Sequence, residues 1–375
     1  MSPLATARYD LEARRARTRA LRRRRRRRTL LVVVAMVAVV AAAGVALGGR
    51  RHHGPSGTTA SGASGPAQTA ATSGTDPTTT TLRAPAVERA PFAVASVTLP
   101  LMDGSRPVPT IVRYPAVRVH GTLIPARKAA PFPLIVFSGG WKVEPSAYRD
   151  LLGAWTAAGY VVAFPEYPGT LPGEKTPGEG DIANHPGDLL AVLTALHHAT
   201  GPLDGLIDQA RLGLAGHSDG GDVTDAIVAN SCCHIAGVTA AVILSGAELD
   251  SWRGAYGPPS VPLLVVQGDA DVVNRPACSQ QIYDAAGTTR FYLDLLGAGH
   301  YSPYLDGSAL VGQHVDAGVA RAPAYRTAVV QSTLGFWHQY LSGTGGSSWT
   351  AAADVPGVSQ LTAGAPVPQT GSCPP

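Results

Sequence analysis

One serine in the chain stands between glycines in a pattern that suits a nucleophile. The segment 216–220 (Gly-His-Ser-Asp-Gly) follows a short apolar run, residues 212–215, and opens a stretch with helical spacing. A serine at so sharp a strand-to-helix turn takes a strained backbone conformation, and side chains two residues away would collide. Gly216 and Gly220 remove those collisions. We therefore expect Ser218 to project from the turn as an activated hydroxyl.

The residues Gly-His-Ser-Asp-Gly-Gly at 216–221 resemble the nucleophile turn of the α/β-hydrolase superfamily, and the resemblance covers about residues 92–341. Within the superfamily the chain looks closest to the branch that contains chlorophyllases, dienelactone hydrolases, secreted polyester hydrolases and platelet-activating-factor acetylhydrolases. The resemblance implies a serine esterase without a cofactor. It also implies that an acid and then a histidine follow the serine along the chain.

The acid of such a triad is expected after the apolar run 263–266. Asp269 and Asp271 both follow that run, and the local sequence resembles the family's turn at the acid strand, which points to Asp271. Asp269 is an alternative, whose other role would be to cap the turn through hydrogen bonds to the backbone. Glu248 or Asp250 is a second alternative, because some relatives place the acid after the preceding strand.

The histidine is expected just beyond the last strand, where His300 stands in Leu-Gly-Ala-Gly-His-Tyr-Ser-Pro. This segment resembles the loop that delivers the catalytic imidazole. His197 and His198 are adjacent on an expected helix and cannot share one face, and His217 is part of the serine turn. His300 is therefore the expected base.

These three side chains predict acyl transfer. His300 would accept the proton of Ser218 and return it to the leaving group, while Asp271 fixes the tautomer of the imidazole. The expected activity is hydrolysis of a carboxylic ester, from a lipid, a polyester or another acyl ester. Two alternatives are a cell-surface acyltransferase with the same triad and a non-catalytic surface-binding protein that has kept the fold.

An oxyanion hole needs two donors aimed at the developing negative charge. The backbone N–H of Asp219, directly after the nucleophile, is expected to be one. The other is expected in the turn Ser-Gly-Gly-Trp that follows the run 134–137. By resemblance the donor is the N–H of Trp141, but this turn departs from the family's commonest His-Gly form, so Gly140 stays open as well.

Short apolar runs and stretches of helical spacing alternate between residues 91 and 342, with two antiparallel strands at one edge. This alternation predicts an α/β fold with a mostly parallel central sheet and helices on both faces. The expected strands are residues 94–101, 110–119, 134–137, 160–164, 212–215, 238–244, 263–266 and 290–295; the expected helices are 145–158, 188–198, 220–229, 277–286 and 325–341.

An unbroken run of arginines, residues 22–28, precedes an uncharged stretch over residues 29–49 made mostly of Leu, Val and Ala. At about 1.5 Å per residue this stretch spans roughly 30 Å, the thickness of a bilayer's hydrocarbon core. The positive-inside rule places residues 1–28 in the cytoplasm as a basic tail and everything after the stretch outside. We expect a transmembrane signal-anchor; a secretory signal peptide cleaved at Ala43 is the alternative.

The charge of the chain changes sign once this tail is set apart. Twelve arginines against Asp10 and Glu12 give residues 1–28 a charge of +10 out of a total of +4, which leaves −6 for residues 29–375. The remainder therefore carries no basic footprint for nucleic acid. The expected partners are an ester substrate and, through the N-terminal helix, a membrane.

Composition also divides the remaining chain. Residues 50–90 are Thr, Ser, Gly, Ala and Pro with few large apolar side chains, which predicts a disordered linker. Residues 91–342 are the expected catalytic domain, and residues 343–375 a flexible Gly/Ser/Thr-rich tail.

The cysteines do not suit a metal site. Four of them, without a C-x-x-C pair, are too irregularly spaced for zinc, and we expect neither a metal nor a cofactor. An extracytoplasmic position makes disulfides plausible, with three possible pairings among Cys232, Cys233, Cys278 and Cys373.

Overall fold

The computed structural model describes residues 92–373 except for residues 173–177, 260, 288 and 308–315. The expected tail (1–28), transmembrane helix (29–49) and linker (50–90) lie outside the described residues. Within the described part of the chain, no helix has both the length and the apolar character needed to cross a bilayer.

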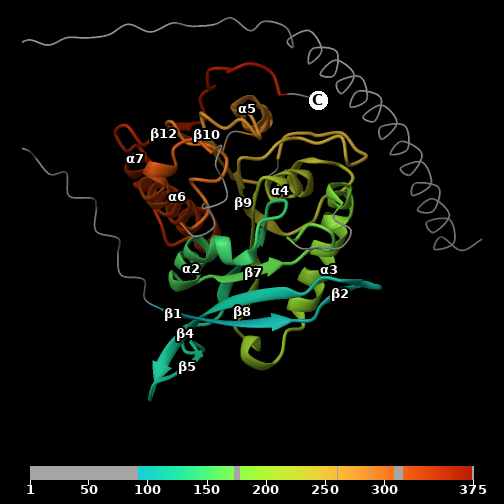
Figure 1. The fold of residues 1–375 in the computed structure, drawn as a ribbon. Coiled ribbons are helices and arrows are strands. Elements are labelled where there is room, and N and C mark those ends of the chain that lie inside the picture. The colour runs from blue at the N-terminus through green and yellow to red at the C-terminus, as the bar shows by residue number, and fades with distance from the viewer. Residues whose placement is uncertain (1–91, 173–177, 260, 288, 308–315, 374–375) are drawn as a thin grey trace, which may run out of the picture. The chain divides into compact units, whose positions relative to one another are not determined.

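A mixed, mostly parallel sheet forms the centre of the described domain (Figure 1). Its strands are β1 (Ala93–Leu99), β4 (Thr110–Val119), β5 (Thr122–Pro125), β6 (Phe132–Ser138), β7 (Val161–Pro165), β8 (Ile207–His217), β9 (Val238–Leu244), β10 (Leu263–Gly268), β11 (Arg290–Leu295) and β12 (Ser359–Ala363). The order is β1-β4-β7-β6-β8-β9-β10-β11-β12, with β5 paired to β4. Neighbours from β7 to β11 run parallel, whereas β4 pairs antiparallel with β1, β5 and β7, and β12 with β11.

Helices cover both faces of this sheet (Figure 1). They are α2 (Arg149–Ala157), α3 (His185–His197), α4 (Asp219–Ala229), α5 (Pro276–Ala285), α6 (Ala322–Trp337) and α7 (Trp349–Ala353). Shorter turns are η1 (Pro145–Tyr148), η2 (Glu179–Asn184), η3 (Gly201–Leu203), η5 (Val319–Arg321) and η6 (His338–Ser342), and a hairpin of β2 (Met102–Asp103) and β3 (Arg106–Pro107) precedes β4. Side chains of α3, α4 and α5 share one hydrophobic core, and those of α2, α6 and α7 share the other.

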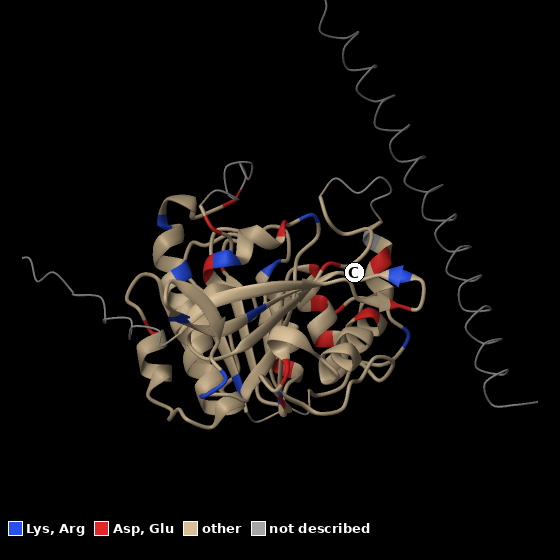
Figure 2. Ribbon diagram, turned by 90° about the horizontal axis from the view of Figure 1, so that it is seen from below, with Lys and Arg blue, Asp and Glu red and all other residues tan. Residues whose placement is uncertain are grey.

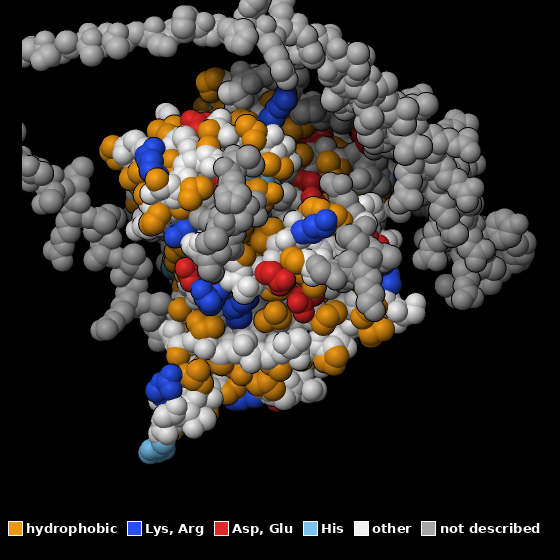
Figure 3. All heavy atoms as spheres, in the orientation of Figure 1, with side chains coloured by type: hydrophobic (Ala, Val, Ile, Leu, Met, Phe, Trp, Pro, Cys, Tyr) orange, Lys and Arg blue, Asp and Glu red, His pale blue; other side chains and the backbone are white. Residues whose placement is uncertain are grey.

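The central strands are apolar because both of their faces are covered. β6, β7, β9 and β10 contain no charged residue, as a parallel sheet buried on both sides requires. In Figure 2 the charged residues lie mainly on the surrounding helices and loops. On the face drawn in Figure 3, the basic side chains of the described residues are interspersed with acidic and apolar ones. The α/β class with a mostly parallel sheet, predicted from the alternation of apolar runs, is confirmed.

The C-terminal segment departs from the prediction of a flexible tail over residues 343–375. It contains α7 and β12, and β12 pairs along β11 with Leu361 opposite Leu293. The Trp349 ring packs on Phe291 and Phe336, with ring centroids 5.0 Å and 6.1 Å apart. One large buried aromatic side chain and one strand pairing thus order a segment whose average composition favours disorder.

The cysteines form two disulfides, so the described residues contain no free thiol. Cys278, on α5, pairs with Cys373 at a sequence separation of 95. Cys232 and Cys233, which are adjacent, pair with each other. The first bond fastens the end of the described chain to α5.

Candidate active site

Ser218 occupies the turn between β8 and α4. β8 ends at His217 and α4 begins at Asp219, and Ser218 itself has φ 56° and ψ −126°. A non-glycine residue in this region costs roughly 1–3 kcal/mol, so the surrounding structure must hold it there. The turn presents the serine at the carboxyl ends of the parallel strands, where polar side chains from several strands meet.

The glycines around Ser218 are required by close backbone contacts. A Cβ on Gly216 would lie 1.9 Å from the carbonyl oxygen of Gly220. A Cβ on Gly220 would lie 1.9 Å from the carbonyl oxygen of Ser138, at the end of β6. Both collisions are with backbone atoms, which cannot rotate away. The predicted reason for these glycines is therefore present in the structure.

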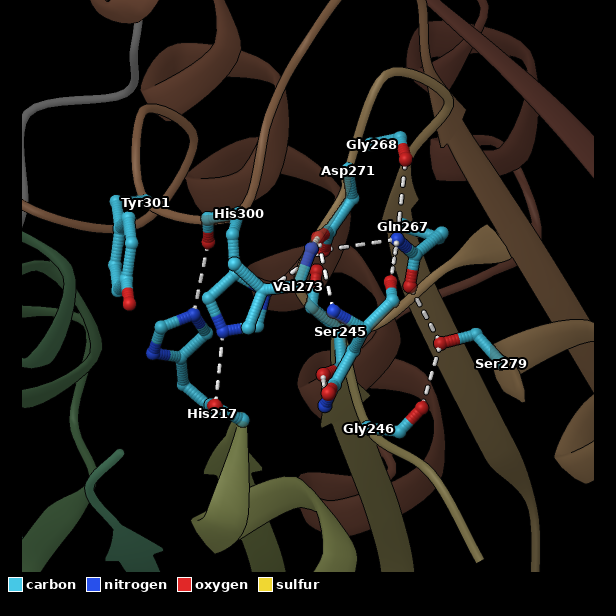
Figure 4. A network of polar contacts seen from close by, with 12 residues as sticks. His217, Ser245, Gly246, Gln267, Gly268, Asp271, Val273, Ser279, His300 and Tyr301 are labelled. Atoms are coloured by element: carbon cyan, nitrogen blue, oxygen red, sulfur yellow. Dashed lines mark hydrogen bonds and ion pairs between the residues drawn. The ribbon is translucent and has the colours of Figure 1, made fainter. Parts of the chain in front are cut away.

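The structure brings Ser218, His300 and Asp271 together, and Figure 4 shows the contact between His300 and Asp271. His300 Nε2 lies 2.8 Å from Ser218 Oγ, and His300 Nδ1 lies 2.7 Å from Asp271 Oδ2. The carboxylate accepts, so Nδ1 carries the hydrogen, and Nε2 of the neutral ring accepts the hydroxyl proton. Ser218, His300 and Asp271 are 8%, 1% and 3% exposed as whole residues, which limits competition from water. This arrangement activates a hydroxyl for attack on an electrophilic carbon.

The Asp271 carboxylate is fixed by its own loop. Its Oδ1 accepts the backbone N–H groups of Val273 (2.8 Å) and Asn274 (3.0 Å). Its Oδ2 accepts a hydrogen bond from Gln267 Nε2 (3.1 Å), besides the one from His300. Gln267 is in turn held by Ser279 on α5, whose hydroxyl donates to Gln267 Oε1 (2.5 Å; Figure 4).

The alternative acids lie elsewhere. Asp269 Oδ1 accepts the N–H of Gly297 (2.6 Å), so it caps the loop that carries the histidine. Glu248 accepts a hydrogen bond from Gln281 on α5 (2.9 Å), and Asp250 is exposed. Of the four carboxylates weighed from the sequence, Asp271 is the one that the structure places on the imidazole.

A further carboxylate braces the histidine loop. Asp316 accepts the backbone N–H groups of Tyr301 (3.1 Å) and Ser302 (2.6 Å), directly after the histidine. Gly299 permits this approach, because a Cβ there would lie 2.2 Å from Asp316 Oδ1. Asp269 and Asp316 therefore hold the two sides of the loop, and no local motif in the sequence pointed to Asp316.

The expected oxyanion turn follows β6 and approaches the serine. A Cβ on Gly140 would lie 3.2 Å from Ser218 Cβ. The Gly140 N–H donates to the hydroxyl of Tyr148 (3.0 Å), so it is engaged away from the serine. This geometry favours Trp141 over Gly140 as the donor from this turn. The N–H of Asp219 belongs to the first turn of α4, whose amides have no acceptor within their own helix.

His217, inside the serine motif, is fully buried and bonded at both ring nitrogens. Nδ1 lies 2.8 Å from the hydroxyl of Tyr148, and Nε2 lies 2.9 Å from the carbonyl oxygen of His300. Burial, and secondly the nearby His300, lower the pKa of His217 well below its ordinary value. The two rings are 4.9 Å apart between centroids. Two positive charges at that distance would repel by about 3 kcal/mol at an effective dielectric constant of about 20.

The sequence predicted the three side chains that the structure brings together, but not the side chains that hold them. Gln267, Tyr148 and Asp316 reach the site from a strand (β10), a short helical turn (η1) and a loop, respectively. Tyr148 and Asp316 do not share a local sequence motif with the residues that they support. Gln267 is the exception, because it stands four positions before Asp271. A polar side chain at the end of an otherwise apolar buried strand was the one available signal.

No protein-family model matches the chain, and no curated protein matches it either. Among the described residues, no group of three or more His, Cys, Asp and Glu side chains is arranged to hold a metal ion. What can be said of the site therefore comes from its geometry and chemistry.

Proposed function

We propose that the protein is a serine hydrolase of the α/β-hydrolase superfamily that cleaves carboxylic esters through an acyl-enzyme. The observation that carries the proposal is the pair of hydrogen bonds made by His300, whose Nε2 accepts from Ser218 Oγ (2.8 Å) and whose Nδ1 donates to Asp271 Oδ2 (2.7 Å). The serine lies at a strand-to-helix turn, and the acid and the histidine follow it in chain order, as in that superfamily.

Acylation follows from these positions. Ser218 Oγ forms a bond to the ester carbonyl carbon while its proton passes to His300 Nε2. The carbonyl oxygen becomes an oxyanion, which in this proposal accepts hydrogen bonds from the N–H groups of Asp219 and Trp141. His300 then returns the proton to the departing alcohol oxygen, whose bond to the carbon breaks. Asp271 stabilises the imidazolium that exists between these two transfers.

Deacylation repeats the same steps with water. His300 Nε2 removes a proton from a water molecule, whose oxygen attacks the acyl carbon. The bond to Ser218 Oγ breaks, and the proton returns to that oxygen. The products are a carboxylic acid and the free enzyme, so no oxidant, reductant or metal is needed to balance the reaction.

We propose further that the catalytic domain works outside the cytoplasm, anchored by residues 29–49. The arginine run before that segment and the uncharged length of the segment support this position. The disulfide between Cys278 and Cys373 supports it too, because such bonds persist in oxidising compartments. N-terminal sequencing of the mature protein distinguishes a retained anchor from cleavage at Ala43.

The hydrolase proposal is tested by treating the full-length protein with a fluorophosphonate probe and mapping the adduct. We expect phosphonylation of Ser218, loss of labelling in Ser218→Ala, and turnover of p-nitrophenyl acetate by the unmodified protein alone. Comparison of short and long acyl chains then ranks the substrates. An unlabelled Ser218 together with no ester turnover would rule the proposal out.

A further inference from the structure

Four groups around the serine turn form one chain of hydrogen bonds. The Gly140 N–H donates to Tyr148 Oη (3.0 Å), and Tyr148 Oη lies 2.8 Å from His217 Nδ1. His217 Nε2 lies 2.9 Å from the carbonyl oxygen of His300 (Figure 4). The chain therefore runs from the oxyanion turn, through η1 and the serine turn, to the loop that carries the base.

Only one arrangement of hydrogens satisfies every contact. The His300 carbonyl can only accept, so His217 Nε2 carries the ring hydrogen. Nδ1 of the neutral ring then accepts, which requires the Tyr148 hydroxyl to donate to it. The hydroxyl oxygen remains the acceptor for the Gly140 N–H. Every donor points in the same direction along the chain, and His217 is held as one neutral tautomer.

This fixed direction has two consequences for the site. His217 stays uncharged beside His300, which itself becomes positive during each proton transfer. The Gly140 N–H is held on Tyr148, and this fixes the orientation of the peptide group on one side of Gly140. The peptide group that carries the Trp141 N–H is held at its carbonyl, because the Gly140 oxygen accepts the N–H of Val143 (3.2 Å).

We propose that Tyr148 and His217 are positioning residues that couple the oxyanion turn to the histidine loop, so that both are set before the substrate binds. The inference rests on the proposed hydrolase function. It assigns His217 a role beyond fitting the turn, and it assigns Tyr148 a role that its position in the sequence does not suggest.

The alternative is that both side chains only fill the core. Tyr304 provides the matched control, because its ring centroid lies 4.8 Å from that of His217 and its hydroxyl is also buried. That hydroxyl contacts Ser245 Oγ (3.0 Å) and donates to the Val266 carbonyl (3.1 Å). Tyr304→Phe therefore removes a buried hydroxyl group, as Tyr148→Phe does. It leaves the hydrogen bonds from Gly140 to His300 intact.

The kinetic test compares Tyr148→Phe with Tyr304→Phe in the full-length protein. We expect Tyr148→Phe to lower kcat about 10- to 100-fold with little change in KM, because a misaligned oxyanion donor acts on the transition state. Its affinity for an arylboronic acid, which forms a tetrahedral adduct with the serine, falls in parallel. Tyr304→Phe stays within about threefold of the unmodified protein on both measures. Equal losses in the two variants overturn the proposal.

The tautomer of His217 is a second readout that needs no turnover. Nitrogen-15 NMR of the imidazole rings, with the His217 signals assigned from their absence in His217→Gln, should show hydrogen on Nε2 alone at neutral pH. Hydrogen on Nδ1, or on both nitrogens, contradicts the direction of the chain.

The two readouts separate the failure of this inference from that of the proposed function. If the fluorophosphonate does not label Ser218 and no ester is cleaved, the hydrolase proposal fails whatever the NMR spectrum shows. If Ser218 is labelled but Tyr148→Phe matches its control, the function stands and the positioning role does not.

Discussion

The Asp271 carboxylate accepts hydrogen bonds from four donors, which are the side chains of His300 and Gln267 and the N–H groups of Val273 and Asn274. A carboxylate held in this way cannot turn away from the imidazole. It therefore determines both the orientation of the ring and the nitrogen that carries the hydrogen. Asp269, two residues earlier, supports the histidine loop from outside the triad.

These different positions predict different effects of the same substitution. Asp271→Asn should lower kcat about 1,000- to 10,000-fold, because an amide can stabilise the wrong tautomer and cannot balance the imidazolium charge. Asp269→Asn keeps an Oδ1 that can accept from Gly297 and should stay within about tenfold. Steady-state kinetics on one activated ester compares them. A larger loss for the Asp269 variant would show that the acid has been assigned to the wrong residue.

Asp225, on α4, is a carboxylate that the triad does not use. It is 1% exposed, and its Oδ2 has no hydrogen-bond partner among the described residues. Burial, with a smaller contribution from Glu248, raises the pKa of Asp225 well above its ordinary value. The folded state therefore holds this proton to higher pH than the unfolded state does. Stability from this group is full below the ordinary carboxyl pKa of about 4 and is lost as the pH rises from there through the raised folded pKa.

Asp225→Asn should remove that loss. We expect its Tm to exceed that of the unmodified protein by about 2–5 °C at about pH 8, where an ionised Asp225 is most costly, and to match it near about pH 4. Asp250→Asn, at an exposed carboxylate, is the control and should change Tm little at either pH. Thermal unfolding followed by circular dichroism gives both curves. A Tm gain that is equal at both pH values would contradict the role of ionisation.

How far the site can be predicted from sequence depends on how local each contact is. Ser218 could be found because the glycines that permit its conformation are two positions away on each side. Asp271 and Asp269 could not be separated with certainty, because the backbone of one turn decides which carboxylate faces the ring. Tyr148 and Asp316 could not be found, since only tertiary packing brings them to the loops that they support.

At the scale of elements, the serine turn is a tightly constrained junction, because β8 and α4 meet there with backbone atoms in contact. Gly216 and Gly220 have no space for a side chain. At Gly153, within α2, a Cβ would have no described atom within 4 Å apart from its chain neighbours and the backbone of its own helix. Substitution of glycine by alanine should therefore lower the stability of the protein at Gly216 and raise it at Gly153.

Gly216→Ala should lower the free energy of unfolding by more than about 3 kcal/mol and abolish ester turnover, because its methyl group meets the Gly220 carbonyl. Gly153→Ala should raise it by about 0.5–1 kcal/mol, since alanine costs less than glycine within a helix. Urea unfolding measures both. A Gly216→Ala protein with unchanged stability would show that the turn is wider than described.

Strands whose apolar residues form a local run or a local alternation were predictable in detail. The expected strands 110–119, 238–244 and 290–295 have the bounds of β4, β9 and β11. β12 and α7 were missed because their order depends on partners far away in sequence. β12 is ordered by pairing with β11, and α7 is ordered by the contacts of the Trp349 ring with Phe291 and Phe336.

Across the whole described domain, the Cys278–Cys373 bond closes the longest covalent loop, at a separation of 95 residues. In the chain-entropy account, closing a loop of this length restricts the unfolded chain by up to about 4–5 kcal/mol. The bond between Cys232 and Cys233 closes almost no loop and gains little from the same effect. The two disulfides should thus differ in their contribution to stability.

Replacing Cys278 and Cys373 together by serine should lower the free energy of unfolding by about 2–4 kcal/mol and leave kcat/KM of the folded protein within about twofold. Replacing Cys232 and Cys233 together should cost less than about 1 kcal/mol. Urea unfolding without reductant, followed by tryptophan fluorescence, compares the two variants. A larger loss from the adjacent pair would mean that its contribution is not entropic.

The position of β12 sets the point at which this protein can be shortened. A fragment that ends at Ser342 would lack β12. The backbone N–H and C=O groups of β11 that pair with β12 would then be open, although those on the other side of β11 stay paired with β10. An open strand edge recruits strands from other molecules and promotes aggregation. A fusion partner or affinity tag attached beyond Cys373 keeps that edge covered, and so it is the safer choice for producing soluble protein.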